Sequence, residues 1–168
     1  MNAYILCGGE SRRMGRPKAT LLFQDIPMAL HIARLAEKAG FSPFFVAKES
    51  QNFKFSYPIL LDQEEKKHPI SGILRAMEHC PDRLFLVLPC DTPFLTKTSL
   101  AQFLKAETPM VAFDGNLHPL VGIYTTEDKC RAKETLEQNL SLKHFSKKFL
   151  TVFFSPEELH NCNYPEDL

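Results

Sequence analysis

The residues best suited to chemistry lie in a glycine-rich segment near the N-terminus. Gly8 and Gly9 follow an apolar run directly, and the basic side chains after them are Arg12, Arg13, Arg16 and Lys18. Because glycine has no Cβ, the backbone can approach a ligand closely there, and successive N–H groups in such a turn bind anions. The segment is strongly basic in a chain of zero net charge. We therefore expect it to bind phosphate, which arginine holds bidentately and lysine as a point charge.

A carboxylate at Asp91 is the best candidate for a metal ligand. It follows the apolar run Leu84 to Leu88 and stands between Pro89 and Pro93, which stiffen the turn. Magnesium takes one or two protein carboxylates and completes its shell with water and phosphate oxygens. We therefore expect Asp91 to bind Mg²⁺ together with a nucleoside triphosphate, the alternative being that it caps a turn or helix.

A second carboxylate, Asp62, follows the run Ile59 to Leu61. It is expected to accept hydrogen bonds from a ribose or base, or to support the metal through water, the alternative again being a loop cap. The stretch from His68 to Gly72 opens the next helix, and helix N-termini favour anions.

The elements that must position these residues alternate between strands and helices. The patterning predicts strands over Ala3 to Cys7, Phe44 to Ala47, Ile59 to Leu61, Leu84 to Leu88, Met110 to Phe113, Leu120 to Tyr124 and Val152 to Phe154. Helices are expected after Pro27, across Gly72 to Met77, over Thr98 to Lys105 with Leu100, Phe103 and Leu104 inward, and twice more before the last strand.

This alternation predicts a Rossmann-like three-layer α/β/α fold with a mostly parallel sheet. Asp114-Gly115-Asn116 is a turn signal, so a late hairpin should add one antiparallel strand. Ligands of such sheets bind beyond the carboxyl ends of the strands, which is where the loop glycines and both aspartates are placed.

Composition limits the class of protein. A chain of 168 residues fits a single domain spanning residues 1–168. Zero net charge argues against binding to nucleic acid or to a membrane surface, and no apolar run approaches the roughly 20 residues of a membrane span. The five cysteines contain no C-x-x-C pair, so we expect free thiols in a reducing cytoplasm.

Seven motifs, in order, resemble those of the molybdenum cofactor guanylyltransferases (the MobA family) within the MobA-like NTP transferases. Leu6-Cys7-Gly8-Gly9 resembles that family's L-A-G-G, Arg12-Arg13-Met14-Gly15 its x-R-M-G, and Lys18 its signature lysine. The other matches are Asp62 with Pro69-Ile70-Ser71-Gly72, Pro89-Cys90-Asp91-Thr92-Pro93, His118-Pro119-Leu120, and the terminal stretch from Asn161 to Leu168. The resemblance implies a fold like that of the nucleotide-diphospho-sugar transferases.

The resemblance also implies a reaction. The substrates would be MgGTP and molybdenum-molybdopterin, whose terminal phosphate attacks the GTP α-phosphorus. Pyrophosphate leaves, and the product is a guanine dinucleotide cofactor. Protein partners implied by the resemblance are a molybdenum-insertion protein or a chaperone of the receiving apoenzyme.

Roles for individual residues follow from the same resemblance. Arg12 and Lys18 would neutralise phosphates and, with Asp91 as the Mg²⁺ ligand, form the catalytic set. The nucleotide-binding residues would be Leu6, Cys7, Gly8, Gly9, Lys18, Asp62 and Asp91. Asn161 and Asn163 are candidates for the pterin side.

Departures from the family pattern leave alternatives open. Cys7 stands where the family has alanine, either as a small tolerated replacement or as a reactive thiol of low pKa beside a basic loop. Arg16-Pro17-Lys18 resembles the cytidylyltransferase relatives, and Lys48 stands where the family often has a nucleotide-contacting asparagine. The alternatives are therefore a molybdopterin cytidylyltransferase, a sugar-phosphate nucleotidyltransferase, or a non-catalytic protein that binds GTP or the cofactor.

Overall fold

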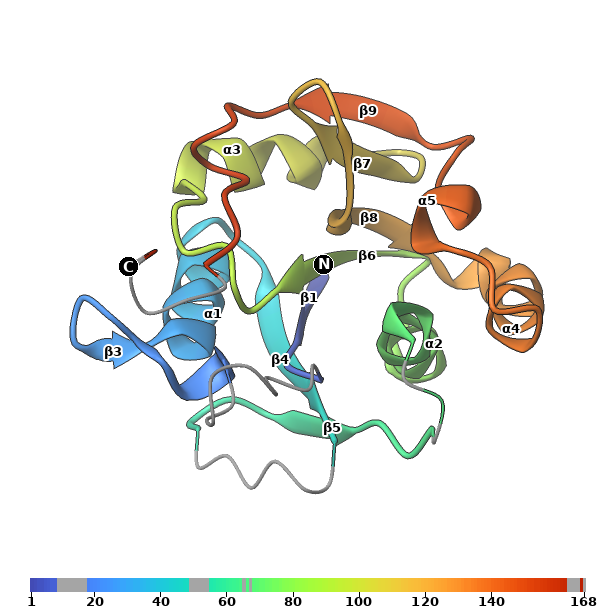
Figure 1. The fold of residues 1–168 in the computed structure, drawn as a ribbon, viewed down its shortest axis with the longest axis horizontal. Helices are drawn as coiled ribbons and strands as arrows, with labels where there is room; N and C mark the ends of the chain where they lie inside the picture. The colour runs from blue at the N-terminus through green and yellow to red at the C-terminus, as the bar shows by residue number, and fades with distance from the viewer. Residues whose placement is uncertain (9–17, 49–54, 65, 67, 163–166, 168) are drawn as a thin grey trace.

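A seven-stranded sheet forms the centre of the molecule (Figure 1). The computed structural model describes residues 1–8, 18–48, 55–64, 66, 68–162 and 167. In spatial order the strands are β5 (Ile59–Leu61), β4 (Ser42–Ala47), β1 (Asn2–Leu6), β6 (Leu84–Pro89), β8 (Leu117–Thr125), β7 (Met110–Phe113) and β9 (Leu150–Phe153). The predicted central strand is thus confirmed, because β6 lies in the middle of the sheet and is buried along its whole length.

One strand runs against the others. The pairs β5–β4, β4–β1, β1–β6 and β7–β9 are parallel, whereas β8 is antiparallel to both of its neighbours, β6 and β7. The turn between β7 and β8 contains Gly115 at φ 114°, a backbone conformation that glycine adopts without a steric penalty. The hairpin and the single antiparallel strand expected from the Asp-Gly-Asn signal are confirmed.

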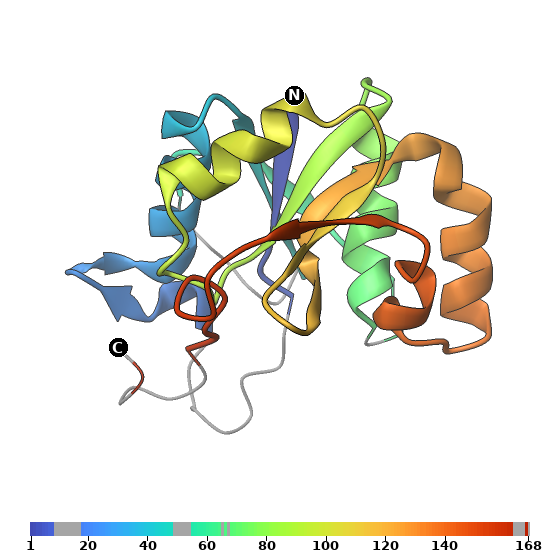
Figure 2. The ribbon, with the colours of Figure 1, turned by 90° about the horizontal axis from the view of Figure 1, so that it is seen from above.

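Helices cover both faces of the sheet, as Figure 2 shows from above. Helices α1 (Met28–Lys38) and α3 (Lys97–Ala101) pack on one face. Helices α2 (Pro69–His79), α4 (Lys129–Glu137) and α5 (Leu142–Phe145) pack on the other. The three-layer α/β/α architecture is therefore confirmed.

Side-chain alternation along the strands explains the two cores. On β1, Ala3 and Ile5 enter the core beneath α1, and Tyr4 enters the opposite core beneath α2. Successive side chains of a strand point to opposite faces, so a strand covered on both sides must be apolar throughout. This is why the sequence of β6 has no polar residue.

Two details differ from the sequence prediction. The helix expected over Thr98 to Lys105 is α3 followed by a 3-10 turn, η2 (Gln102–Lys105), and Leu104 is 41% exposed instead of inward. The tighter 3-10 winding rotates the later side chains away from the α-helical face. Sequence patterning also missed a small hairpin of β2 (Leu22–Phe23) and β3 (Ile26–Pro27).

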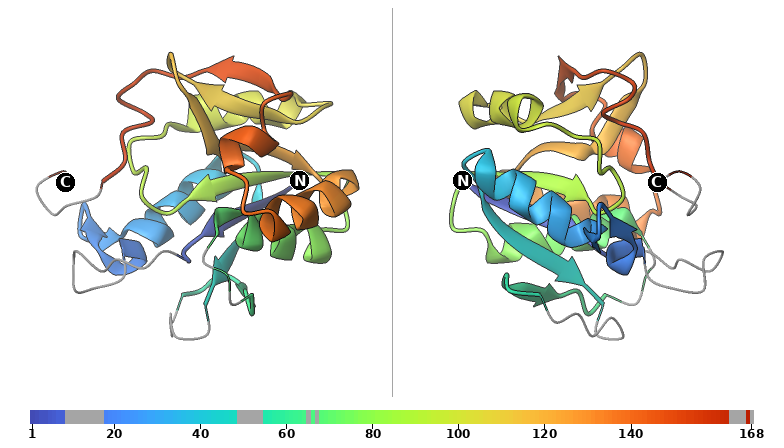
Figure 3. Two further views of the ribbon diagram at one scale, coloured as in Figure 1. Left: turned by 45° about the vertical axis from the view of Figure 1, so that its right-hand side comes forward. Right: turned by 90° about the vertical axis from the view of Figure 1, so that its left-hand side faces the viewer.

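This hairpin packs against α1 (Figure 3), and Cys162 is buried together with Phe23 of the hairpin and Met28 at the start of α1. The remaining 3-10 turns are η1 (Lys18–Thr20) and η3 (Thr126–Asp128). Within the described part of the chain, no helix is long and apolar enough to span a membrane.

The bulge in the β7–β8 pair gives a test of the packing. A Cβ built on Gly122 would lie 2.5 Å from the carbonyl oxygen of Met110, beside the register shift between Val111 and Ala112. We expect Gly122→Ala to lower the free energy of unfolding by about 1–3 kcal/mol, as overpacking does, measured by urea unfolding. Gly8→Ala is the matched control, because its nearest neighbour would be 3.9 Å away. Equal stability of both variants would contradict this account of β8.

Candidate nucleotide-binding site

Three parallel strands bring the predicted residues to one edge of the sheet. Cys7 follows β1, Asp62 follows β5, and Asp91 follows β6, each within two residues of the strand end. Because β5, β4, β1 and β6 are parallel, these residues share the carboxyl-end edge. The topology therefore places Cys7, Asp62 and Asp91 at the edge where the sequence predicted them.

The central contact of this edge joins Lys18 and Asp91. The Lys18 Nζ donates to Asp91 Oδ2 at 3.0 Å, although the two residues lie 73 positions apart in the sequence. Both side chains remain partly exposed, at 25% and 18%, so they can still reach a ligand. Two residues singled out separately from the sequence are thus in direct contact, and they place a positive and a negative charge side by side.

The backbone of Asp91 is held from the C-terminal segment. The Cys162 N–H donates to the Asp91 carbonyl at 2.8 Å. The Cys162 side chain is fully buried, and this burial raises the pKa of its thiol to about 11. Cys162, which follows β9, therefore fixes the backbone at Asp91.

Asp62 is a buried carboxylate with several partners. Its Oδ2 lies 2.8 Å from Lys48 Nζ and accepts a hydrogen bond of 2.8 Å from Ser71 Oγ. Its Oδ1 accepts the Glu64 N–H at 3.1 Å. Asp62 thus makes the contact of a loop cap, and it also supplies a negative charge at the N-terminus of α2, where an anion is favoured.

Lys48 is a functional candidate that the sequence prediction left out of the site. It follows β4, and its side chain reaches Asp62 and also donates to the Glu64 carbonyl. A Cβ on Gly8 would lie 3.9 Å from Lys48 Cγ, so Lys48 stands beside the first loop glycine. The sequence feature that could have indicated this role is the position of Lys48 directly after a parallel strand.

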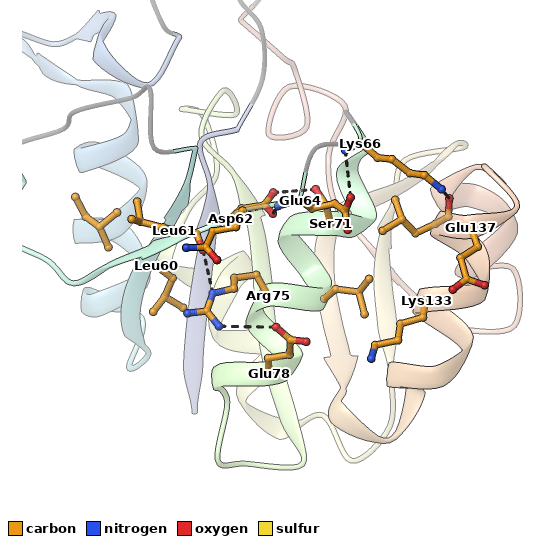
Figure 4. Close-up of a pocket in the computed structure, with 14 residues that line it drawn as sticks. Leu60, Leu61, Asp62, Glu64, Lys66, Ser71, Arg75, Glu78, Lys133 and Glu137 are labelled. Atoms are coloured by element: carbon orange, nitrogen blue, oxygen red, sulfur yellow. Dashed lines mark hydrogen bonds and ion pairs between the residues drawn. The ribbon is translucent and has the colours of Figure 1, made fainter.

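A pocket of about 780 Å³ opens on the outer side of Asp62 (Figure 4). Asp62 and Ser71 line its inner wall, Arg75 reaches from α2 to the Leu61 carbonyl of β5, and Lys133 and Glu137 line the side formed by α4. Neither Lys18 nor Asp91 borders it. Among the described residues of the predicted site, Asp62 alone borders the pocket, which is distinct from the Lys18–Asp91 contact.

Cys7 is a buried thiol in this environment. Its side chain is 3% exposed. The pKa of Cys7 is raised well above its usual value, mainly by a hydrogen bond with the Cys90 thiol and to a smaller extent by burial. A raised pKa suppresses the thiolate, which is the reactive form. The structure therefore supports the tolerated small replacement, and the low-pKa alternative is wrong.

The other predicted residues are placed only in part. Leu6 is half-buried, and a Cβ on Gly72 would lie 3.1 Å from its Cδ2, so α2 packs closely on the end of β1. Gly8 is exposed, and so is Asn161. Gly9, Arg12 and Asn163 lie outside the described residues.

The described residues offer few groups for a metal. No cluster of three or more His, Cys, Asp or Glu side chains occurs among them. A single partly exposed carboxylate, Asp91, beside a lysine does fit Mg²⁺ brought in by a nucleotide, because that ion takes most of its ligands from phosphate and water.

Comparison with known proteins gives a consistent result. The family model for the MobA-like NTP transferase domain matches residues 3–151. A Flavobacterium johnsoniae protein named "Probable molybdenum cofactor guanylyltransferase" is 26% identical, covering 97% of this chain and 96% of its own. A Halalkalibacterium halodurans protein with the same name is 30% identical, and the match covers 98% of this chain and 93% of that protein.

A solved structure shares the fold. Molybdopterin-guanine dinucleotide biosynthesis protein A from Archaeoglobus fulgidus superposes with a TM-score of 0.78 at 20% identity, covering 99% of this chain and 94% of that one. At this identity the likeness establishes the architecture.

The Lys48–Asp62 contact can be measured by a double-mutant cycle. We expect Lys48→Met and Asp62→Asn to show a coupling of about 0.5–3 kcal/mol in the free energy of unfolding, the range for contacting residues. The cause is the 2.8 Å ion pair, whose carboxylate is 8% exposed. Arg83→Met with Glu127→Gln is the control cycle, because that pair is 3.6 Å apart and exposed. Additive effects at Lys48 and Asp62 would show that the pair is not formed.

Thiol labelling tests the environment of Cys7. At pH 8, we expect iodoacetamide to modify Cys130, which is exposed, while Cys7 reacts only when the protein unfolds. Peptide mass spectrometry after timed labelling, with and without urea, measures both rates. Labelling of native Cys7 as fast as Cys130 would contradict the buried, high-pKa assignment.

Proposed function

The chain belongs to the MobA-like NTP transferase family, and we propose that it transfers GMP from MgGTP to molybdenum-molybdopterin, releasing pyrophosphate and forming the guanine dinucleotide cofactor. The names of its relatives, molybdenum cofactor guanylyltransferases, support the guanine nucleotide and the acceptor. The observation that carries the proposal for this chain is the Lys18–Asp91 contact at the carboxyl-end edge of the sheet.

The reaction needs no protein nucleophile. A terminal phosphate oxygen of the acceptor forms the new bond to the GTP α-phosphorus, and the bond to the pyrophosphate oxygen breaks. The protein therefore acts by positioning two phosphorylated substrates and by stabilising charge that spreads over their oxygens. The buried thiols of Cys7 and Cys162 have no role in bond making, in agreement with their raised pKa values.

Lys18 is proposed to neutralise phosphate charge. In the protein alone its ammonium is held by Asp91 at 3.0 Å. This contact keeps the long side chain ordered and directed at the edge where phosphates arrive. Arg12 is proposed to add a second, bidentate phosphate contact.

Asp91 is proposed as the protein ligand of Mg²⁺. When bound, Mg²⁺ supplies charge neutralisation on the phosphate oxygens. Asp91 Oδ2 accepts a hydrogen bond from Lys18, and the Asp91 carbonyl accepts one from the Cys162 N–H. The carboxylate is therefore oriented before the substrate binds. Such preorganisation costs no rearrangement during the reaction.

The nucleotide is proposed to lie between β1 and β5. Leu6, Cys7, Gly8 and Gly9 would form the floor, and Asp62, held by Lys48, would accept hydrogen bonds from the nucleotide. The exposed position of Gly8 beside Lys48 supports this arrangement. In this placement, the phosphates of the nucleotide would point toward Lys18 and Asp91.

The setting is proposed from composition and fold. A cytoplasmic location is supported by five free cysteines, and a single domain over residues 1–168 by the continuous sheet. A molybdenum-insertion protein and an apoenzyme chaperone are the proposed protein partners.

Calorimetric titration tests the nucleotide assignment. GTP, CTP and ATP should each be titrated with and without Mg²⁺, and we expect Mg²⁺-dependent preference for GTP. A preference for CTP would favour the cytidylyltransferase alternative that Arg16-Pro17-Lys18 left open. Binding of MgGTP without turnover in the presence of acceptor would favour the non-catalytic alternative, and absence of binding to any nucleotide would refute the site.

Charge removal at the central contact should impair turnover. We expect Asp91→Ala to abolish Mg²⁺-dependent transfer, and Lys18→Ala to lower kcat roughly 10²–10³-fold, as loss of one charge-stabilising donor does. Lys129→Ala is the matched control, because it removes a lysine from an exposed ion pair with Glu78 on the α2–α4 side. Initial rates at saturating substrates measure the effect. Near wild-type rates for Asp91→Ala would remove it from the site.

A further inference from the structure

A cluster of aromatic side chains lies directly beyond Asp91. Phe94 follows it by three residues and packs edge-on against Phe23 of β2, with ring centroids 5.5 Å apart. The His160 ring lies 6.1 Å from Phe94, and His31 packs 4.8 Å from Phe23. Phe94 remains 37% exposed and His160 is also exposed. Part of the cluster thus presents aromatic surface to the same edge as Asp91.

Hydrogen bonds hold this cluster in place. His31 Nε2 lies 3.0 Å from the Pro93 carbonyl, next to Phe94. On the other side, Glu158 is bonded by Thr96 and Ser99, and the Cys162 N–H donates to the Asp91 carbonyl. The loop that carries Asp91 and Phe94 is therefore tied to the segment that carries His160. Rings fixed in this way bind a flat ligand with little further loss of entropy.

The position of the cluster separates it from the proposed nucleotide subsite. Asp62 and Lys48 follow β5 and β4, on one side of β1, whereas Phe94 follows β6, on the other side. Asp91 also follows β6, three residues before Phe94, and Lys18 is bonded to it. A nucleotide placed over β1 with its phosphates at Lys18 leaves the Phe94 side for the second substrate, whose phosphate must reach the same point.

We propose that Phe94 and His160 form a stacking platform for the flat pterin ring system of the acceptor, with its phosphate directed toward Lys18 and Asp91. The proposal rests on the proposed function, because that function makes the acceptor a pterin phosphate. Offset and edge-on ring contacts of this kind add to the burial of apolar surface. The platform would supply acceptor affinity without any contact to the nucleotide.

Binding of a fluorescent pterin monophosphate tests the platform without requiring turnover. Quenching of the probe gives its Kd for the full-length protein. Phe94→Leu keeps an apolar side chain but removes the ring, and should raise this Kd roughly 5- to 150-fold, the range for loss of one stacking ring. Phe94→Tyr restores a ring and should bind like the wild type. His160→Ala should weaken binding in the same direction.

Two controls separate stacking from a structural effect. Phe153→Leu removes an aromatic ring that is 68% exposed on the edge strand β9, and should leave the probe Kd unchanged. The Kd for MgGTP, measured by calorimetry, should also be unchanged in Phe94→Leu. A parallel loss of GTP affinity would mean that Phe94 acts through the loop of Asp91, which overturns the platform.

The remaining outcomes are also decisive. An unchanged probe Kd in Phe94→Leu, or no binding of the probe by the wild-type protein, overturns the platform. Failure of the proposed function gives a different result: the probe binds through Phe94, yet the wild-type protein forms no dinucleotide from GTP and molybdopterin.

Discussion

The ion pair between Lys18 and Asp91 connects two segments that come from distant parts of the chain. Lys18 begins the 3-10 turn that leads into the β2–β3 hairpin, and Asp91 leaves the central strand β6. Because β6 is buried along its whole length, the position of Asp91 is fixed by the core. The charge pair therefore has a rigid base, and the other contacts of the edge are arranged around it.

The carboxyl-end edge has two sides with different chemistry. On the β4–β5 side, the Lys48–Asp62 pair places charged groups next to Gly8, as a polar nucleotide requires. On the other side, Phe94 and His160 offer aromatic surface. A transferase with two phosphorylated substrates needs one point where the phosphates meet and two different pockets for the remaining parts. The sheet order provides this separation, because β1 lies between β4 and β6.

Sequence patterning could predict the sheet, its two helical layers and its antiparallel strand, because these depend on local periodicity and on one turn signal. It could also predict that Asp62 and Asp91 lie on one edge, since parallel strands end together. It could not predict that Asp62 is bonded to Lys48 and Ser71, because such contacts depend on side-chain packing between elements. The exposure of Leu104 was missed for a related reason, since the change from α-helical to 3-10 winding is set by tertiary contacts.

The most direct test is the reaction itself with both nucleotides in competition. Purified protein is incubated with molybdenum-loaded molybdopterin, Mg²⁺ and equal concentrations of GTP and CTP, and the dinucleotide products are identified by mass spectrometry. The account predicts a guanine dinucleotide cofactor with release of one pyrophosphate for each molecule formed. A cytosine dinucleotide as the main product, or no dinucleotide while GTP is bound, would contradict it.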